Sequence, residues 1–225
     1  MAEALLSVAK QRYGRIAAVT EERGFPQAFT QSFIEVAQST ALTIDNQLFP
    51  SGTTDFRPLL IRLKSRAPEA LLISTDSANN LLLIVKQLAE IGWKPPLLSQ
   101  YIAGIPTFYQ NARGLADGMI FGDTPDVACA APHAGCAVYL EFVRRYGEPK
   151  SSSYMVGSSI AAFMALASAA RSGTDPHTYL YEAQLDTPLG VISFDRNGDV
   201  VGPKHTLKII EGSRPRPYLH TGLAW

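Results

Sequence analysis

The sequence predicts an α/β fold in which an open, mostly parallel sheet is flanked by helices. From Ala2 to Gly122, short apolar stretches alternate with segments whose apolar residues recur at helical spacing. The stretch from Ala70 to Ile73 is apolar without alternation, which is typical of a parallel strand covered on both faces. Strands and helices that alternate at these lengths imply parallel strands joined by right-handed crossovers.

The helices and strands of this first part are bounded by residues with known positional preferences. Gly14 ends the first helix, and Pro26 suits the first turn of the second. Asp55 can cap the third helix, whose first turn tolerates Pro58, and Gly92 ends the fourth. We therefore expect helices over Ala2–Arg12, Pro26–Gln38, Asp55–Arg66 and Leu81–Ile91, and strands over Arg15–Val19, Ala41–Asn46, Ala70–Ile73, Pro96–Ser99 and Gly118–Gly122.

After Gly122 the pattern changes, because an irregular stretch interrupts the alternation of strands and helices. Further along, Asp175 can cap a helix, and the pair Asn197–Gly198 favours a hairpin with a type I′ turn. We expect helices over Gly135–Tyr146, Tyr154–Arg171 and from Asp175 to near Leu185, a hairpin of Val191–Phe194 with Val200–Val201, and a last strand over Thr206–Ile210. The tail after Glu211 has no assignment.

The balance of charged and apolar residues argues against a nucleic-acid-binding protein and against a membrane-spanning protein. The 225 residues include 20 Lys and Arg and 20 Asp and Glu, so the formal net charge is +0 and no basic stripe marks a nucleic-acid surface. No apolar run is expected to span a bilayer, since the Ala-rich stretch Ile160–Ala170 is too short. The first residues, with Glu3 and no cleavage-site pattern, predict an amphipathic helix rather than a signal peptide.

Motifs for catalysis or metal binding are missing from the sequence. No G-x-G-x-x-G follows a predicted strand, and neither a P-loop nor a G-x-S-x-G motif occurs. The four histidines are scattered, and Asp195, Asn197 and Asp199 lack the downstream glutamate of a calcium loop. Glu21 and Glu22 are neighbours in a loop and are expected to be solvated rather than to act as acid and base. The sequence therefore predicts no enzyme, no cofactor and no metal site.

The two cysteines, Cys129 and Cys136, fit no zinc-binding pattern because no second pair exists. We expect them to be free thiols, two small apolar residues near one helix start. A local disulfide, which an oxidising compartment permits, is the alternative.

Several segments carry a resemblance through their order and spacing. The stretch from Phe49 to Thr75, FPSGTTDFRPLLIRLKSRAPEALLIST, combines a loop, a leucine-rich helix and a strand. Around it lie RIAAVTEERGF, QLAEIGWKPPLLSQ, GLADGMIFGDTP, SSSYMVGSSIAAF and PLGVISFDRNGDVVGP. From about Arg15 to about Glu211, these segments resemble the type I periplasmic binding protein family, and within it the solute-binding subunits of branched-chain amino acid ABC transporters.

The resemblance implies how the chain is divided. Residues 1–125 would form the α/β core of the family's second lobe, residues 126–203 would be helices and a hairpin that belong to the first lobe, and residues 204–225 would rejoin the second. In such proteins the sheet of the first lobe comes earlier in the chain, so this sequence resembles a truncated binding protein without its N-terminal lobe. We therefore expect weak or absent ligand binding, and a homodimer that covers the apolar helix within SSSYMVGSSIAAFMALASAA.

Four positions match places where the family contacts its ligand, which implies ligand-binding roles for Phe25, Ser77, Tyr101 and Tyr154. Tyr101 stands where amino acid binders carry a glutamate that pairs with the ligand ammonium. A tyrosine supplies no full negative charge at neutral pH, and a buried unpaired ammonium is costly, so an aromatic or other organic acid is favoured over an amino acid. From the residues alone, Phe25 could equally be a hydrophobic staple, and Tyr101 could cover the edge of the sheet.

The function that the resemblance implies is solute binding for an ABC importer in the periplasm. Its partners would be a small-molecule ligand and an ABC transporter permease, without nucleic acid. The alternative is a sensory or regulatory ligand-binding domain of the same fold, such as an amide sensor or a receptor ectodomain, because fold alone does not separate these functions.

Overall fold

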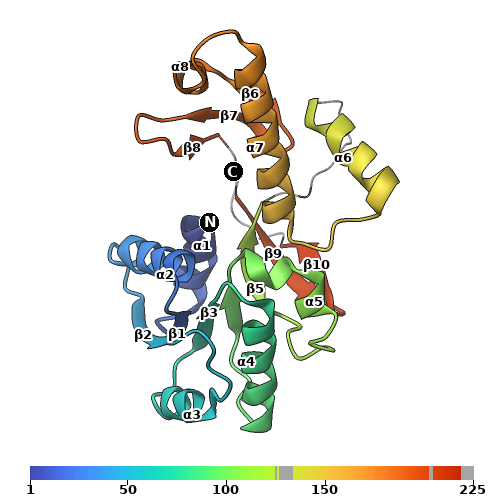
Figure 1. Cartoon of the computed structure of the whole chain (residues 1–225). Helices are drawn as coiled ribbons and strands as arrows, with labels where there is room; N and C mark the ends of the chain where they lie inside the picture. The colour runs from blue at the N-terminus through green and yellow to red at the C-terminus, as the bar shows by residue number, and fades with distance from the viewer. Residues whose placement is uncertain (125, 127–133, 203–204, 219–225) are drawn as a thin grey trace. The chain divides into compact units, whose positions relative to one another are not determined.

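The computed structural model, drawn in Figure 1, describes residues 1–124, 126, 134–202 and 205–218. The chain divides into two compact units. The first unit contains Met1–Asp123 and the described part of Thr206–Trp225, and the second contains the described part of Thr124–His205. The assignment of residues 126–203 to another lobe stays a prediction.

A seven-stranded sheet forms the centre of the first unit. Its strands are β1 (Arg15–Glu21), β2 (Thr43–Phe49), β3 (Ala70–Ser74), β4 (Leu97–Ser99), β5 (Ile120–Asp123), β9 (Thr206–Glu211) and β10 (Arg214–Pro217). They lie in the order β10-β9-β5-β4-β3-β1-β2. Strands β1 to β5 are parallel, β9 runs antiparallel to β5, and β10 runs antiparallel to β9. This is the open, mostly parallel α/β sheet that the sequence predicts.

Helices cover both faces of this sheet. Figure 1 shows α1 (Ala2–Arg12) and α2 (Gly24–Ala37) on one side and α3 (Arg57–Ser65) and α4 (Ala78–Glu90) on the other. Because successive side chains of a strand point to opposite faces, Ile16 and Ala18 of β1 join the core under α1 and α2, together with Phe33. Their neighbours Ala17 and Val19 are also buried, which explains why these strands show no polar alternation.

A buried ion pair fastens β9 to β5. The Nζ atom of Lys208 lies 3.1 Å from Oδ2 of Asp123, and the two side chains are 5% and 1% exposed. Removing one partner of such a pair leaves a buried charge uncompensated, at a cost of about 3–5 kcal/mol. The pair thus stabilises the sheet where the chain leaves the first unit and where it returns.

The second unit combines three helices with a small antiparallel sheet. The helices are α6 (Ala134–Tyr146), α7 (Ser153–Arg171) and α8 (Pro176–Glu182), and the strands are β6 (Leu185–Thr187), β7 (Gly190–Phe194) and β8 (Val200–Val201), in the order β6-β7-β8. The buried residues of α7 are all small and recur every four positions: Gly157, Ala161, Ala165 and Ala169. This small-residue face lets α7 pack closely against α8 and β6.

The hairpin turn of the second unit differs from the prediction. A type I′ turn requires positive φ at both Asn197 and Gly198, but of these two only Gly198 has it, at 82°. The amide of Gly198 donates instead to the carbonyl of Asp195 at 2.9 Å, and the strands pair at Phe194 and Val200. The loop is therefore longer than two residues, and the glycine ends the turn rather than forming its centre.

Other differences concern element bounds. The helix predicted to reach Leu185 ends at Glu182, and Leu185 begins β6. The helix predicted from Asp55 begins at Arg57, although Asp55 Oδ1 still accepts a hydrogen bond from the Arg57 amide at 3.2 Å. The unassigned tail forms β10 with the sequence RPRP, a strand that tolerates proline because it lies at the edge of the sheet.

The prediction of free thiols is wrong for Cys136, which is disulfide-bonded. Cys129, and most of the irregular stretch around it, lie outside the described residues. A disulfide fits an oxidising compartment, as the alternative reading of the sequence allowed.

The expectation that no segment is long and apolar enough to span a bilayer does not hold for helix α7. It has 19 residues and, among the described helices, is the one long and apolar enough to cross a membrane by length and composition. The prediction from the sequence considered only the stretch Ile160–Ala170 and left out the apolar residues that precede this stretch in the helix. Core helices of soluble proteins meet the same criterion, so the finding does not place α7 in a membrane.

Candidate ligand site at the carboxyl edge of the sheet

A pocket lies at the topological switch point of the seven-stranded sheet. From β1 the chain crosses to β2 on one side, and from β3 it crosses to β4 on the other. The loops after β1 and β3 therefore diverge and leave a crevice at the carboxyl ends of the strands, where open α/β sheets bind ligands. The pocket there measures about 630 Å³, and its lining includes Glu21, Arg23, Ser51, Asp76, Ser77 and Asn80.

Glu21, the last residue of β1, holds the loops around this pocket together. Its Oε2 accepts hydrogen bonds from Thr75 Oγ1 at 2.5 Å and from the Asp76 amide at 3.1 Å. Its Oε1 accepts from Ser51 Oγ at 3.0 Å and from Asn80 Nδ2 at 3.3 Å. The side chain is only 3% exposed, so the expectation that Glu21 would be solvated is wrong.

The hydrogen bonds keep Glu21 ionised despite its burial. Burial by itself raises the pKa of Glu21, but the hydrogen bonds from Thr75, Ser51 and the Asp76 amide, with the charge of Arg23, outweigh it and hold the pKa below its ordinary value. The Nε atom of Arg23 lies 3.4 Å from Glu21 Oε1. The carboxylate is therefore a structural anion whose oxygens are already used by the protein.

Asp76, the second carboxylate of the pocket, has a different environment. Its Oδ1 atom is buried and has no hydrogen-bond partner among the described residues. Burial and the neighbouring charge of Glu21 raise the pKa of Asp76 above its ordinary value, although Arg23 and Gln100 oppose them. A buried polar atom without a partner is rare in folded proteins and calls for an explanation.

Gln100, which follows β4, supplies a second acceptor of this kind. It is fully buried, and its Nε2 donates to the carbonyl of Thr75 at 2.8 Å. Its Oε1 atom is buried without a partner in the described part of the chain. Two acceptors, one after β3 and one after β4, are thus left without donors at the carboxyl edge of the sheet.

An aromatic pair lies at the same edge. Phe25, in the first turn of α2, is 38% exposed, and Tyr101, which begins the 3₁₀ helix η1 (Tyr101–Gly104), is 9% exposed. Their ring centroids are 5.3 Å apart in an edge-to-face arrangement, a favourable geometry for aromatic rings. Ser74 fixes the start of α2 by donating from Oγ to the carbonyl of Pro26 at 3.0 Å.

The other two predicted residues lie apart from this pair. Ser77 lines the pocket and caps α4, since its Oγ accepts a hydrogen bond from the Asn80 amide at 3.2 Å. Tyr154 belongs to the second unit, where it lines another pocket of about 370 Å³ with Ser158 and Phe194. The structure thus brings Phe25 and Tyr101 together and places Ser77 beside Glu21, while a ligand contact of all four stays a prediction.

Sequence reasoning missed three polar residues of this site, namely Glu21, Asp76 and Gln100. All three stand at or just after the carboxyl end of a predicted apolar strand, which is the signal that could have identified them. The motifs TDSANN and SQYIAG contain the two unpaired acceptors, but the resemblance directed attention to Ser77 and Tyr101 instead.

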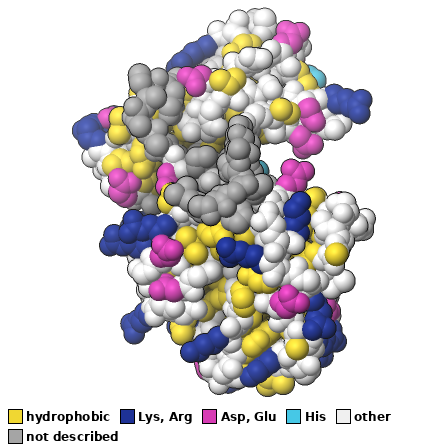
Figure 2. Space-filling view, turned by 180° about the vertical axis from the view of Figure 1, so that it is seen from behind, with side chains coloured by type: hydrophobic (Ala, Val, Ile, Leu, Met, Phe, Trp, Pro, Cys, Tyr) yellow, Lys and Arg dark blue, Asp and Glu magenta, His cyan; other side chains and the backbone are white. Residues whose placement is uncertain are grey.

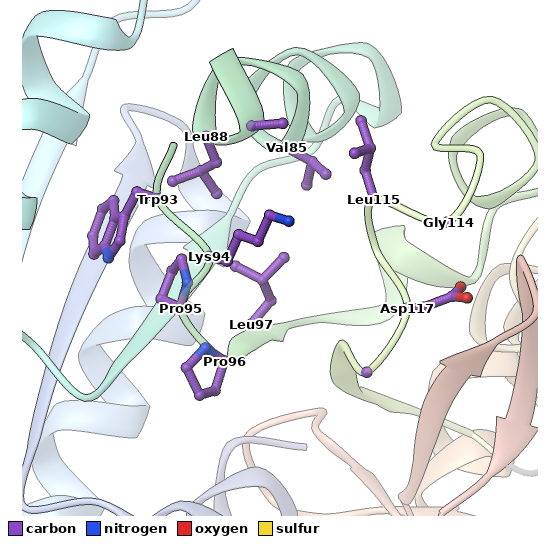
Figure 3. A pocket seen from close by; sticks show the side chains of 12 residues that line it. Val85, Leu88, Trp93, Lys94, Pro95, Pro96, Leu97, Gly114, Leu115 and Asp117 are labelled. Carbon is purple, nitrogen blue, oxygen red and sulfur yellow. The ribbon is translucent and has the colours of Figure 1, made fainter. Parts of the chain in front are cut away.

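A second pocket of the first unit lies at the opposite edge of the sheet. It measures about 380 Å³ and adjoins Pro96 and Gly118, which precede β4 and β5. Figure 3 shows Val85 and Leu88 of α4 turned toward the same hollow as Leu97. Because it lies at the amino ends of the parallel strands, the pocket is not where an open α/β sheet binds its ligand.

Metal ligands and surface charges can be assessed for part of the molecule. In the described ranges, no three His, Cys, Asp or Glu side chains gather to hold a metal ion. Figure 2 shows Lys and Arg interspersed with Asp and Glu over the face drawn, rather than gathered in a basic stripe.

Comparisons with known proteins agree with the fold. A family model described as periplasmic binding protein matches residues 1–209. No curated protein matches the chain. Leucine binding protein LivK of Thermotoga maritima has a TM-score of 0.83 at 18% identity, over 97% of this chain and 63% of that one. An extracellular ligand-binding receptor of Rhodopseudomonas palustris has a TM-score of 0.79 at 16% identity, over 96% and 66%.

A third similar structure is LivJ of Streptococcus pneumoniae, described as a branched-chain amino acid transporter substrate binding protein in complex with isoleucine. It has a TM-score of 0.76 at 17% identity, over 95% of this chain and 61% of that one. The chain thus spans less than two thirds of the length of these structures. The family model covers most of the chain, and the resemblance and fold class predicted from the sequence are confirmed. The chain belongs to the periplasmic binding protein family.

Proposed function

We propose that this chain binds a small solute at the carboxyl edge of its seven-stranded sheet, as part of the solute-binding subunit of an ABC importer. The observation that carries the proposal is the pocket of about 630 Å³ at the switch point between β1 and β3. The family is one of solute-binding proteins rather than enzymes. The pocket is lined by fixed polar side chains, and an aromatic pair lies at the same edge of the sheet, a combination suited to a small organic ligand.

Three features bear on the ligand class, and they point in different directions. LivK and LivJ are described with leucine and isoleucine, which favours an apolar amino acid here as well. Tyr101, in place of a glutamate, favours an aromatic or other organic acid, and its contact with Phe25 supports an aromatic body for the ligand. Asp76 weakens the argument for an acid, because it supplies a carboxylate at a neighbouring strand end.

The partners and location follow from the same function. An importer subunit delivers its solute to an ABC transporter permease, and the family works in the periplasm or outside the cell. A homodimer stays a prediction, supported by the exposed apolar residues Phe163 and Leu166 of α7, which are 63% and 64% exposed. No nucleic-acid partner is proposed.

Ligand-induced stabilisation tests the proposal. A panel of amino acids, aromatic acids and amines, each at millimolar concentration, is added to the purified chain, and the melting temperature is recorded. A solute that binds the folded state raises the melting temperature by mass action. Because the resemblance implies weak binding by this part of the fold, we expect a small rise, from at least one class of solute at millimolar concentration. The matched variant is Phe25→Leu, which removes one ring of the aromatic pair from a partly exposed position. It should reduce the ligand-induced shift while leaving the ligand-free melting temperature nearly unchanged. A panel in which no solute raises the melting temperature contradicts the proposed function.

A further inference from the structure

We propose that the hollow at the amino ends of the parallel strands is a second binding site, which takes a monocarboxylate with an aliphatic chain. The site goes beyond the proposed function, because it lies at the opposite edge of the sheet from the solute pocket and shares no lining residue with it. The hollow measures about 380 Å³, a size typical of pockets that bind small organic molecules.

Aliphatic side chains from three segments form the walls of this hollow. Val85 and Leu88 of α4 face the same space as Leu97 of β4, as Figure 3 shows. These three side chains are almost buried, whereas Leu115, on the turn before β5, is 44% exposed and forms an outer wall. An aliphatic chain laid between them would remove apolar surface from water, which favours binding.

Hydrogen bonds fix the two loops beside the hollow. In the loop after α4, the Trp93 amide donates to the Leu88 carbonyl at 2.9 Å. In the turn before β5, the Gly118 amide donates to the Ile210 carbonyl of β9 at 2.8 Å. The hollow is therefore formed before a ligand arrives, and binding does not have to order these loops at an entropic cost.

The charge that faces the hollow is that of Lys94. Figure 3 shows its side chain extending into the space between Val85 and Leu97, and Lys94 has no ion-pair or hydrogen-bond partner among the described residues. Asp117, the acidic residue of the lining, turns its carboxylate away from Lys94, and its Oδ1 accepts a hydrogen bond from the Ser213 amide at 3.0 Å. The hollow thus presents a cation over apolar walls, and a carboxylate on an aliphatic chain complements both.

The negative groups at the end of α4 are compensated within the protein. Lys64 Nζ donates to the carbonyls of Ile91 and Gly92 at 3.0 and 3.2 Å, which offsets the partial negative charge of the helix end. Glu90, the last residue of α4, pairs with Arg57, whose nitrogen lies 3.6 Å from its carboxylate oxygen. A ligand carboxylate beside Lys94 therefore meets little repulsion from α4.

Nuclear magnetic resonance titration of the isotope-labelled chain tests the site. The probes are octanoate, kept below the concentration at which it forms micelles, octylamine, which has as many carbon atoms and the opposite charge, and propionate, which keeps the carboxylate and lacks the long chain. We expect octanoate to shift the backbone amides of Lys94, Leu115 and Gly118 and to leave that of Asp76 unchanged. Octylamine and propionate should bind there more weakly by about threefold or more.

Two variants separate the charge from the apolar wall. Lys94→Met removes the charge and keeps an unbranched apolar stem, so it should weaken octanoate binding by about threefold or more without weakening octylamine. Leu115→Ala removes part of the wall at an exposed position and should also weaken octanoate. The matched control is Lys86→Met, which removes the same charge from an exposed position of α4 outside the lining and should leave the titration unchanged.

Equal binding of octylamine and octanoate overturns the inference, because apolar contact alone would then explain both. An unchanged octanoate titration in Lys94→Met overturns it as well. So does an octanoate titration without shifts at the three amides, whether or not amides of the second unit respond. The proposed function is tested separately by the melting temperature with the solute panel, so either proposal can fail while the other stands.

Discussion

Two carboxylates of one pocket have opposite environments, and this difference gives their charges opposite effects on stability. Glu21 accepts hydrogen bonds from four groups and is almost fully buried. Asp76 lines the same pocket, yet its Oδ1 has no partner among the described residues. The pKa of Glu21 lies below its ordinary value and that of Asp76 lies above it. Their variants should therefore change stability in opposite directions.

Glu21→Gln should destabilise the first unit at neutral pH by about 2–3 kcal/mol, because charge-assisted hydrogen bonds are lost and an amide is turned toward donors. A lowered pKa in the folded state means that the stabilisation is present above the unfolded-state pKa of about 4.3 and is lost as pH falls through the folded value. Denaturant unfolding at neutral and acid pH should show a gap between variant and wild type that narrows in acid. The neighbouring exposed residue gives the control, since Glu22→Gln should have little effect at either pH. An equal effect of both substitutions contradicts the assigned role.

Asp76→Asn should stabilise the ligand-free protein at neutral pH. A raised folded-state pKa means that ionisation of Asp76 opposes folding, so wild-type stability rises as pH falls through that pKa, and the neutral variant has no such dependence. We expect a rise in melting temperature on the order of 1–3 °C at pH 7 that vanishes in strong acid. A variant that loses stability would indicate a structural role for the ionised carboxylate instead.

The sequence could not show the role of Glu21, because its four donors lie 30, 54, 55 and 59 positions further along the chain. Adjacent glutamates in a loop are commonly solvated, and only the meeting of three strand ends buries this one. The resemblance predicts Phe25 and Tyr101 as ligand contacts, and the structure brings their rings together, while their contact with a ligand stays a prediction. Asp76 and Gln100 were missed because an unpaired acceptor becomes visible only when the surrounding donors are placed.

At the scale of elements, the prediction succeeds where the signal is local. The bounds of α1 are predicted correctly, from a helical apolar pattern that Gly14 ends. The strand β10 has no such signal, because RPRP has low strand propensity and pairs with β9 only at the edge of the finished sheet. The prediction of the hairpin turn fails for a similar reason. The register of the two strands, rather than the Asn197–Gly198 pair, decides which residues form the turn.

Gly202 gives a test of the small sheet in the second unit. Its φ is +115°, and a Cβ atom there would lie 2.2 Å from the carbonyl oxygen of Val191. Gly202→Ala should destabilise β7 and β8 by about 1–3 kcal/mol through backbone strain, and further through the clash. Gly190→Ala is the matched control in the same sheet, because its φ is +96° but no atom lies near the added methyl. Hydrogen exchange of the β7 and β8 amides should be faster in Gly202→Ala than in Gly190→Ala, and equal rates would contradict the predicted clash.

At the scale of the whole molecule, the second unit has an apolar surface that its own residues leave uncovered. The small residues of α7 face inward, whereas Phe163 and Leu166 are 63% and 64% exposed. A groove of about 370 Å³ between α6 and α7 is lined by Phe142, Met155 and Phe163, among others. Contiguous apolar surfaces of this kind usually mark contacts with other protein. The prediction of self-association rests on this surface.

The chain should therefore associate through α7, and light scattering should give a mass of at least twice the 24.4 kDa of one chain. In a two-fold contact each substitution occurs on both copies, so Phe163→Glu places two like charges at the contact and should shift the population to monomers. Because Phe163 is exposed, the melting temperature measured at low protein concentration should change little. Val200→Glu introduces the same charge at an apolar residue of β8 that is 52% exposed, and it should leave the mass unchanged. A wild-type chain that stays monomeric at every concentration contradicts the prediction, and equal dissociation by both variants would show that net charge, rather than the α7 surface, controls association.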